Sequence, residues 1–113
     1  MTQILLALIV FFSAGTVAAG ELAFVRPRGL IDLDAFACTK ISTSTILKRV
    51  CYDEENKYLL IEIGDIFYHY CEVPNQIVLA LVRAPSVASY YNSKIRSGPY
   101  NCKSKRMPVY EGQ

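Results

Sequence analysis

A short apolar N-terminal segment followed by four cysteines limits what this chain can fold into more than any other sequence feature. Residues 4–12 are all apolar, and residues 17–19, Val-Ala-Ala, precede Gly20. This layout is typical of a secretory signal peptide with an A-x-A-like cleavage site. The run is about half as long as the roughly 20 apolar residues that a membrane-spanning helix needs. We therefore expect residues 1–19 to be a signal peptide, with an uncleaved membrane tether as the alternative.

Cleavage at this site would leave on the order of 94 residues, enough for one modest hydrophobic core. Cys38, Cys51, Cys71 and Cys102 are an even set, and paired cysteines are typical of exported proteins. Zinc binding is disfavoured, because the sequence has no C-x-x-C pair and His69 is its only histidine. The sequence thus predicts a periplasmic or secreted domain with two disulfides and no metal.

The pattern after residue 20 predicts a linker and then a small sheet. Pro27 and Gly29 interrupt any period and favour an extended linker over residues 20–34, which leaves residues 35–113 for the domain and its basic C-terminal tail. We expect strands at residues 35–41, 46–52, 58–63 and 66–71, where apolar residues alternate with polar ones.

The dipeptide Gly64-Asp65 fits a two-residue type II′ turn between the last two strands. That turn would place Leu59 and Ile61 opposite Tyr70 and Tyr68, with all four side chains on one face. Tyrosines on a sheet can stack nucleic-acid bases, but this shared face predicts that they belong to the core. His69 points the other way and is expected to be a partly exposed structural residue.

Strand register also limits the disulfide pairing. Cys51 and Cys71 would each lie opposite Tyr58, on strands either side of it, and two strand spacings of about 4.8 Å are too far for a bridge. A tight turn at residues 44–45 would place Cys38 opposite Cys51. We therefore predict a Cys38–Cys51 bridge, and Cys102 is left to pair with Cys71.

Two helices are expected after the sheet. Asn75 can cap a helix over residues 76–83, and Pro85 limits its extent. Ser86 can cap a second helix that runs to about Arg96. The predicted fold is α+β, with an antiparallel sheet of three to four strands packed against two short helices and held by disulfides.

Several short motifs carry a resemblance to a known family. They are Thr43-Ser44-x-Ile46, Val50-x-Tyr52-Asp53, Tyr68-x-Tyr70-x-x-Val73-Pro74, Ala84-x-Ser86 and Tyr91-Asn92-x-x-Ile95-Arg96. In order and spacing they resemble the KTSC domain, named after a C-terminal segment of some lysyl-tRNA synthetases, over about half the chain. The residues that the resemblance marks as the family motif are Tyr68, Tyr70, Pro74, Asn92 and Arg96. Asp65 and Ala88 depart from the family, and the cysteines indicate an exported subgroup.

The region after the sheet is basic. Between residues 83 and 106 there is no acidic residue, and three tyrosines are interleaved with the basic ones. The basic residues are Arg83, Lys94, Arg96, Lys103, Lys105 and Arg106. They could bind anionic lipid, nucleic acid or an acidic protein, and the alternative is a solvated helix face with a flexible tail.

No catalytic constellation is evident in the sequence. It lacks a glycine-rich phosphate loop, G-x-S-x-G and H-E-x-x-H. Asp53, Glu54 and Glu55 share a predicted surface turn, where their carboxylates would be solvated. We expect a non-catalytic binding module without a cofactor, whose partner is a protein or an anionic surface. RNA binding has been suggested for the family and is the alternative, although an exported protein would rarely meet RNA.

Overall fold

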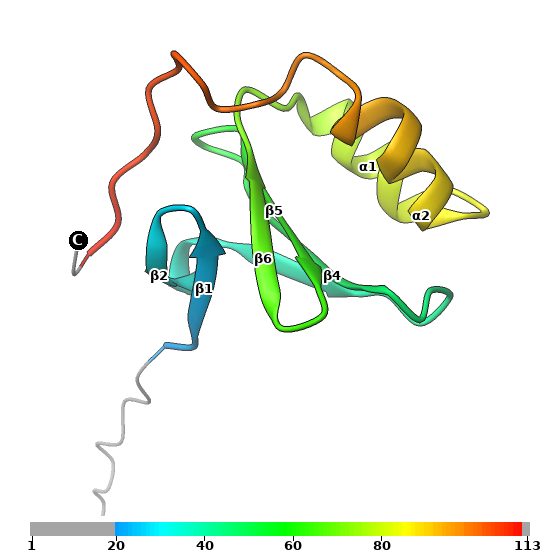
Figure 1. The fold of residues 1–113 in the computed structure, drawn as a ribbon, viewed down its shortest axis with the longest axis horizontal. Coiled ribbons are helices and arrows are strands. Elements are labelled where there is room, and N and C mark those ends of the chain that lie inside the picture. The colour runs from blue at the N-terminus through cyan, green and yellow to red at the C-terminus, as the bar shows by residue number, and fades with distance from the viewer. Residues whose placement is uncertain (1–19, 112–113) are drawn as a thin grey trace, which may run out of the picture.

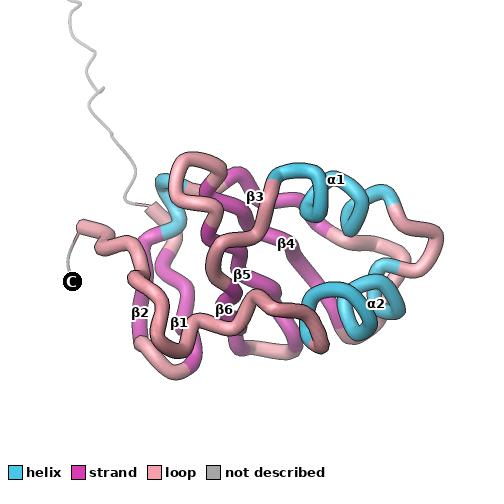
Figure 2. The backbone as a smooth tube through the Cα atoms, turned by 90° about the horizontal axis from the view of Figure 1, so that it is seen from above, coloured by secondary structure: helices cyan, strands magenta, loops and turns pink. Residues whose placement is uncertain are grey.

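The computed structural model describes residues 20–111, which form an α+β fold. The strands are β1 (Leu22–Arg26), β2 (Gly29–Asp32), β3 (Ala37–Lys40), β4 (Leu47–Asp53), β5 (Tyr58–Ile63) and β6 (Ile66–Tyr70). The helical segments are the 3-10 turn η2 (Leu33–Ala35), α1 (Asn75–Arg83), α2 (Val87–Tyr90) and the π-helical turn η3 (Tyr91–Arg96). Helices α1 and α2 lie together at one side of the sheet, and the β1–β2 hairpin lies at the other (Figure 1, Figure 2).

Six strands form one curled, mixed sheet in the order β2-β1-β6-β5-β4-β3. Neighbouring strands are antiparallel except β1 and β6, which run parallel. The predicted fold class is confirmed, but the prediction of three to four antiparallel strands is wrong. The two additional strands, β1 and β2, come from the segment before residue 35.

Residues 20–34 form a β-hairpin rather than the predicted extended linker. Ala23 and Val25 are buried, and the residues on either side of each are exposed, which is the alternation of a strand with one inward face. Pro27 lies between β1 and β2, and Gly29 begins β2 with a φ of +96°. The two residues that suggested an irregular segment therefore mark the turn of a hairpin.

The β5–β6 hairpin has the predicted register. Leu59 lies opposite Tyr70 and Ile61 lies opposite Tyr68. Gly64 has a φ of +64°, in the left-handed region that the first central position of a type II′ turn requires. Local turn chemistry therefore sets which face of each strand is turned toward the helices.

The face of the sheet that carries Leu59 and Ile61 packs against the helices and forms the first core. Both side chains are fully buried, and Leu81 of α1 and Ile95 of η3 are fully buried against them. The cluster consists of Ile41, Leu47, Val50, Tyr52, Leu59, Ile61, Val73, Val78, Leu81, Val87, Tyr91 and Ile95. We call this face of the sheet the helix face.

The starts of the two helices differ in how well the sequence located them. Ser86 caps α2 as predicted, because its hydroxyl accepts a hydrogen bond from the Ser89 amide at 3.2 Å. Asn75 was predicted to be the cap of α1, but it is the first helical residue, and Pro74 occupies the cap position without a side-chain hydrogen bond. The carbonyl of Pro74 accepts from the Ile77 amide at 3.0 Å, so the backbone alone closes this end.

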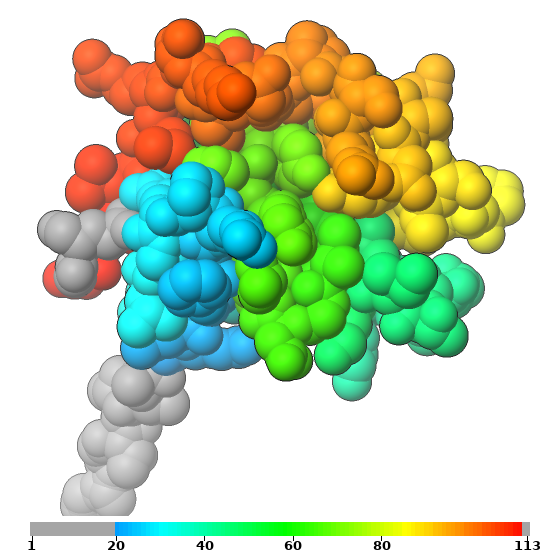
Figure 3. Space-filling view, viewed as in Figure 1, coloured from blue at the N-terminus to red at the C-terminus, as the bar shows by residue number. Residues whose placement is uncertain are grey.

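The opposite face of the sheet, which we call the inner face, is also buried and forms a second core. Leu60 and Phe67 of the sheet pack there with Val25 of the hairpin. The cluster consists of Ala23, Val25, Ile31, Leu33, Cys51, Tyr58, Leu60, Phe67, Cys71 and Tyr110. Figure 3 shows the blue hairpin beside the green strands, with the red C-terminal segment next to the hairpin.

The C-terminal segment is packed rather than flexible at its end. Tyr110 is buried, and its hydroxyl donates to Asp53 Oδ2 at 2.6 Å. Asp53 also accepts hydrogen bonds from the backbone amide and the side-chain amide of Asn56. The prediction of three solvated carboxylates is therefore wrong for Asp53, which is only 4% exposed, and right for Glu54 and Glu55, which are exposed.

The cysteines pair as the strand register predicted. Cys38 lies directly opposite Cys51 across β3 and β4, and their sulfur atoms are bonded. Cys71 at the end of β6 is bonded to Cys102, which ties the C-terminal segment to the sheet. All four cysteines are therefore oxidised, a state typical of proteins in an oxidising, exported location.

One step toward that prediction is wrong. Cys51 lies opposite Leu60 rather than Tyr58, because Asp53 extends β4 and itself pairs with Tyr58. The loop between β4 and β5 is therefore residues 54–57, and Asp53 belongs to β4 rather than to the predicted surface turn. The pairing of β4 with β5 is thus shifted by two residues from the predicted register, which keeps each side chain on its predicted face. The pairing of the cysteines does not depend on this shift.

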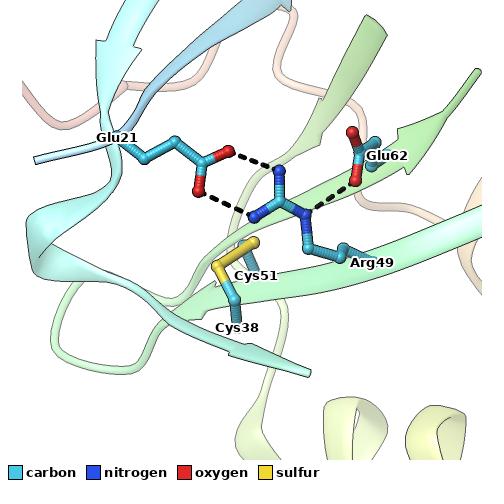
Figure 4. Close-up of polar contacts among 5 residues, drawn as sticks. All are labelled: Glu21, Cys38, Arg49, Cys51 and Glu62. Atoms are coloured by element: carbon cyan, nitrogen blue, oxygen red, sulfur yellow. Dashed lines mark hydrogen bonds and ion pairs between the residues drawn. A yellow bond between two sulfur atoms is a disulfide. The ribbon is translucent and has the colours of Figure 1, made fainter. Parts of the chain in front are cut away.

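Arg49 shows how strongly the sheet curls (Figure 4). Its two terminal nitrogens bind the carboxylate of Glu21 at 2.9 and 2.6 Å, and its Nε binds Glu62 at 2.7 Å. In a flat sheet, β1 and β4 would be three spacings, or roughly 14 Å, apart. The ion pair from Glu21, just before β1, to Arg49 on β4 therefore closes the inner face. The hydrogen bonds to Glu21 and then Glu62 raise the pKa of Arg49, and Arg49 lowers the pKa of Glu21.

The predicted signal peptide, residues 1–19, lies outside the described residues. Within residues 20–111, no helix has both the length and the apolar character needed to cross a membrane.

Candidate functional site

A pocket of about 420 Å³ lies between the sheet and the second helical region. Its lining residues are Ile46, Leu47, Ile63, Tyr68, Tyr70, Ala88, Tyr91, Asn92 and Arg96. Strands β4, β5 and β6 or their immediate ends supply one wall, and α2 and η3 supply the other. The pocket therefore combines an apolar side with hydroxyl, amide and guanidinium groups, and we call it the motif pocket.

Two tyrosines meet in the wall of the motif pocket. The hydroxyl oxygens of Tyr70 and Tyr91 are 2.5 Å apart, and their rings pack edge to face with centroids 5.8 Å apart. Burial first, and then the hydrogen bond with Tyr91, raise the pKa of Tyr70. The Tyr70 hydroxyl therefore stays protonated at physiological pH. One proton of the pair is used in their shared hydrogen bond, and the other can be donated to a ligand.

Arg96 supplies the only charge among the lining residues. Its Nη1 donates to Asn92 Oδ1 over 3.5 Å, which is a long hydrogen bond. No carboxylate in the described part of the chain forms an ion pair with Arg96. The guanidinium therefore keeps most of its donors for a ligand.

The π-helical turn η3 explains how Tyr91 and Arg96 line the same pocket. Five residues along an α-helix rotate a side chain by about 140°, which would separate the two. A π turn has more residues per turn, so residues five apart are rotated by a smaller angle, and such turns occur frequently at functional sites. Ser97 supports the turn, because its hydroxyl donates to the Asn92 carbonyl at 2.9 Å. The sequence predicted a helix here but gave no sign of the π turn.

The structure brings together four of the five residues that the resemblance marked. Tyr68, Tyr70, Asn92 and Arg96 all line the motif pocket, whereas Pro74 caps α1. The prediction that Tyr68 and Tyr70 are core residues describes only part of their position. Both are half-buried and border the pocket. Tyr70 also packs against the first core, whereas Tyr68 is not among the side chains of that core.

The six residues predicted as an anion-binding surface lie on three elements. Arg83 ends α1, Lys94 and Arg96 lie in η3, and Lys103, Lys105 and Arg106 lie in the C-terminal segment. Lys105 donates to the Pro99 carbonyl at 2.7 Å and lies 3.8 Å from Glu72. Of the six, Arg96 is the one in the motif pocket, and Lys105 holds the protein's own C-terminal segment.

A second polar cluster, on the inner face, was missed by sequence reasoning. The Tyr58 hydroxyl lies 3.2 Å from Arg28 Nη1 and 2.8 Å from His69 Nδ1. Arg28 can only donate, so the Tyr58 oxygen accepts from it, and the same hydroxyl shares a hydrogen bond with His69. Burial, and then Arg28, lower the pKa of His69.

The same cluster joins segments that are far apart in the sequence. Arg28 Nη2 donates to the Pro108 carbonyl at 2.8 Å, and the guanidinium lies over the rings of Tyr58 and Tyr110. These contacts hold the N-terminal hairpin, β5 and the C-terminal segment together. His69 also borders a second hollow of about 380 Å³ beneath residues 101–107. The geometry fits the structural role predicted for His69.

No curated protein matches the chain. A scan against protein families matches residues 43–100, more than half of the chain, to the KTSC domain. The matched range contains the motif pocket, α1, α2, η3 and the strands β4 to β6. The chain therefore belongs to the KTSC domain family.

Proposed function

We propose that this protein is a non-catalytic binding module and that the motif pocket is its binding site. One observation carries the proposal. Tyr68, Tyr70, Asn92 and Arg96 are separated by up to 28 positions in the sequence, yet all line one pocket. Pockets of about 300–1,000 Å³ with an apolar lining and a few converging polar groups are typical of small-molecule sites.

The chemistry of the lining supports binding over catalysis. The lining residues include no carboxylate, histidine or thiol that could exchange a proton near neutral pH. Burial raises the pKa of Tyr70, which makes its hydroxyl a poor general acid or base but a stable hydrogen-bond donor. Arg96 stays charged and offers several fixed donors.

We further propose that the protein acts outside the cytoplasm, in the periplasm or as a secreted protein, with residues 1–19 as its signal peptide. The two disulfides support this location. The test is the intact mass of the protein from the envelope fraction, measured after free thiols are blocked. A mass beginning at Gly20 with no blocked thiol is expected, and a full-length species would indicate the membrane-tethered alternative.

The binding function can be tested with a fragment library containing anionic, neutral and cationic compounds. We expect fragments whose chemical-shift changes in the protein centre on Ile46, Ile63 and Ala88. Ala88→Leu should fill the pocket and abolish their binding. Ala80→Leu makes the same change at an exposed position of α1 and should leave binding unchanged. A screen in which no fragment shifts these pocket residues, or in which Ala88→Leu binds as well as Ala80→Leu, would overturn the proposal.

A further inference from the structure

We propose that the ligand of the motif pocket is a small organic acid whose carboxylate binds Arg96 and whose apolar group packs against Ile46 and Ile63. This inference rests on the proposed binding function and assigns its ligand class. The acid can be a free molecule or the last residue of a peptide, because both present a carboxylate beside an apolar side chain.

The charge of the pocket selects an anion. Arg96 is the only charged lining residue, and within the described residues it has no ion-pair partner. Its hydrogen bond to Asn92 is long, at 3.5 Å. The planar guanidinium matches a carboxylate with two parallel N–H···O bonds. A cationic ligand would meet only repulsion from this residue, since no lining carboxylate compensates it.

The tyrosine hydroxyls add a donor for the same anion. Tyr70 and Tyr91 share one hydrogen bond and keep one further proton. Burial keeps the Tyr70 hydroxyl protonated, so the tyrosine pair can donate a hydrogen bond to a ligand oxygen. A neutral hydroxyl also does not compete with the ligand for Arg96, as a tyrosinate anion would. Asn92 supplies an amide next to them.

The apolar wall requires that the acid carry a hydrophobic group. Ile46 and Ile63 border the same concave surface. Ile46 is 63% exposed and Ile63 is half-buried, so both have apolar surface in contact with water. Burial of an apolar group against them removes further hydrocarbon surface from water. A volume of about 420 Å³ is enough for a branched or small aromatic acid.

The test is a titration of the oxidised full chain, followed by methyl and amide NMR, with 4-methylpentanoate and its uncharged amide, 4-methylpentanamide. We expect the acid to bind at least about 10-fold more tightly than the amide, because hydrogen bonds to charged groups are the strong ones. Arg96→Gln should remove this preference and leave the weak binding of the amide unchanged. Arg83→Gln lowers the net charge equally, lies outside the pocket, and should bind both compounds as the original chain does.

The outcomes separate this inference from the proposed function. Equal binding of acid and amide would overturn the acid class while leaving the pocket as a binding site. If neither compound binds and no fragment shifts the pocket residues, both the acid class and the binding function of the motif pocket would be overturned. N-acetyl-leucine and acetate complete the series. Tighter binding of N-acetyl-leucine than of 4-methylpentanoate would identify the ligand as the end of a peptide, and the reverse order would identify it as a free acid. Binding of acetate as tight as that of either compound would refute the requirement for an apolar group.

Discussion

The two faces of the sheet are both buried but are closed in different ways. The helix face is covered by α1, α2 and η3, and its core consists of side chains between residues 41 and 95. The inner face is closed by the hairpin and the C-terminal segment, which lie outside the region matched to the KTSC domain. The matched region therefore supplies nearly all of the first core and one side of the second, which the flanking segments cover.

The closing interactions differ as well. On the helix face, apolar packing dominates, and its large side chains add the Tyr70–Tyr91 pair at the motif pocket and the buried hydrogen bond from the Tyr52 hydroxyl to the Val73 carbonyl. The inner face has both disulfides, the buried Asp53–Tyr110 hydrogen bond and the Arg49 ion pairs. Segments that are added at the chain ends have few residues to bury, so covalent and polar contacts complete their attachment.

The largest expected effect tests whether the inner face is a true core. Leu59 and Leu60 are adjacent, fully buried and on opposite faces. Leu59→Ala and Leu60→Ala should each lower the free energy of unfolding by about 2–5 kcal/mol in urea denaturation. A cost below about 1 kcal/mol for Leu60→Ala alone would show that the second core does not form.

The next effect compares the two disulfides. Cys71 and Cys102 are 31 residues apart and Cys38 and Cys51 are 13 apart. By loop-closure entropy, replacing Cys71 and Cys102 with alanine should lower the free energy of unfolding by about 3.7 kcal/mol. Replacing Cys38 and Cys51 should lower it by about 2.9 kcal/mol. Denaturant unfolding of the two double variants measures both values. A larger loss for Cys38→Ala/Cys51→Ala would mean that the C-terminal segment contributes little to the fold.

Single hydroxyl deletions sharpen the comparison. Tyr110→Phe removes a hydrogen bond from the buried Asp53 carboxylate and should cost about 1–3 kcal/mol. Tyr70→Phe should cost less, about 1 kcal/mol or under, because its partner Tyr91 lines the open motif pocket, where water can replace the bond. Thermal and urea unfolding of the two variants provide the measurement, and the reverse order would contradict the difference between the faces.

The smallest effect is a pH dependence on the inner face. The pKa of His69 is lower in the folded protein than its ordinary value of 6.5, so the unfolded chain binds the proton more tightly. The stabilisation from neutral His69 is complete above pH 6.5 and declines as pH falls through 6.5 toward the lower folded value. Unfolding midpoints should drop between pH 7.5 and 5.5, and His69→Gln should flatten this profile. An unchanged slope in the variant would assign the dependence to other groups.

Several elements of this protein were predictable because their signals are local. Gly64-Asp65 set the β5–β6 register and Ser86 marked the start of α2. Cys38 lies opposite Cys51 as predicted, although residues 41–46 rather than a tight turn at residues 44–45 join β3 to β4. In each case the deciding residues lie within a few positions of the structure that they determine. Backbone conformation and side-chain alternation act over this short range.

The candidate site was predictable in its residues but not in its geometry. The spaced motifs marked Tyr68, Tyr70, Asn92 and Arg96, and the structure places all four in one pocket. The role of Ile46 in that pocket and the π turn that aligns Tyr91 with Arg96 had no local signal. Both arise from how the helical region packs against the strand ends.

By itself, the sequence determined the fold class, the cysteine pairing and the family, because these depend on period, turn residues and motif spacing. The tertiary structure alone decided that residues 20–34 join the sheet, through the parallel pairing of Val25 with Phe67, and that Asp53 is buried by Tyr110. Those contacts join residues that are 42 and 57 positions apart. Burial depends on the partner that covers a surface, and no local pattern in this chain specifies a partner so far away in the sequence.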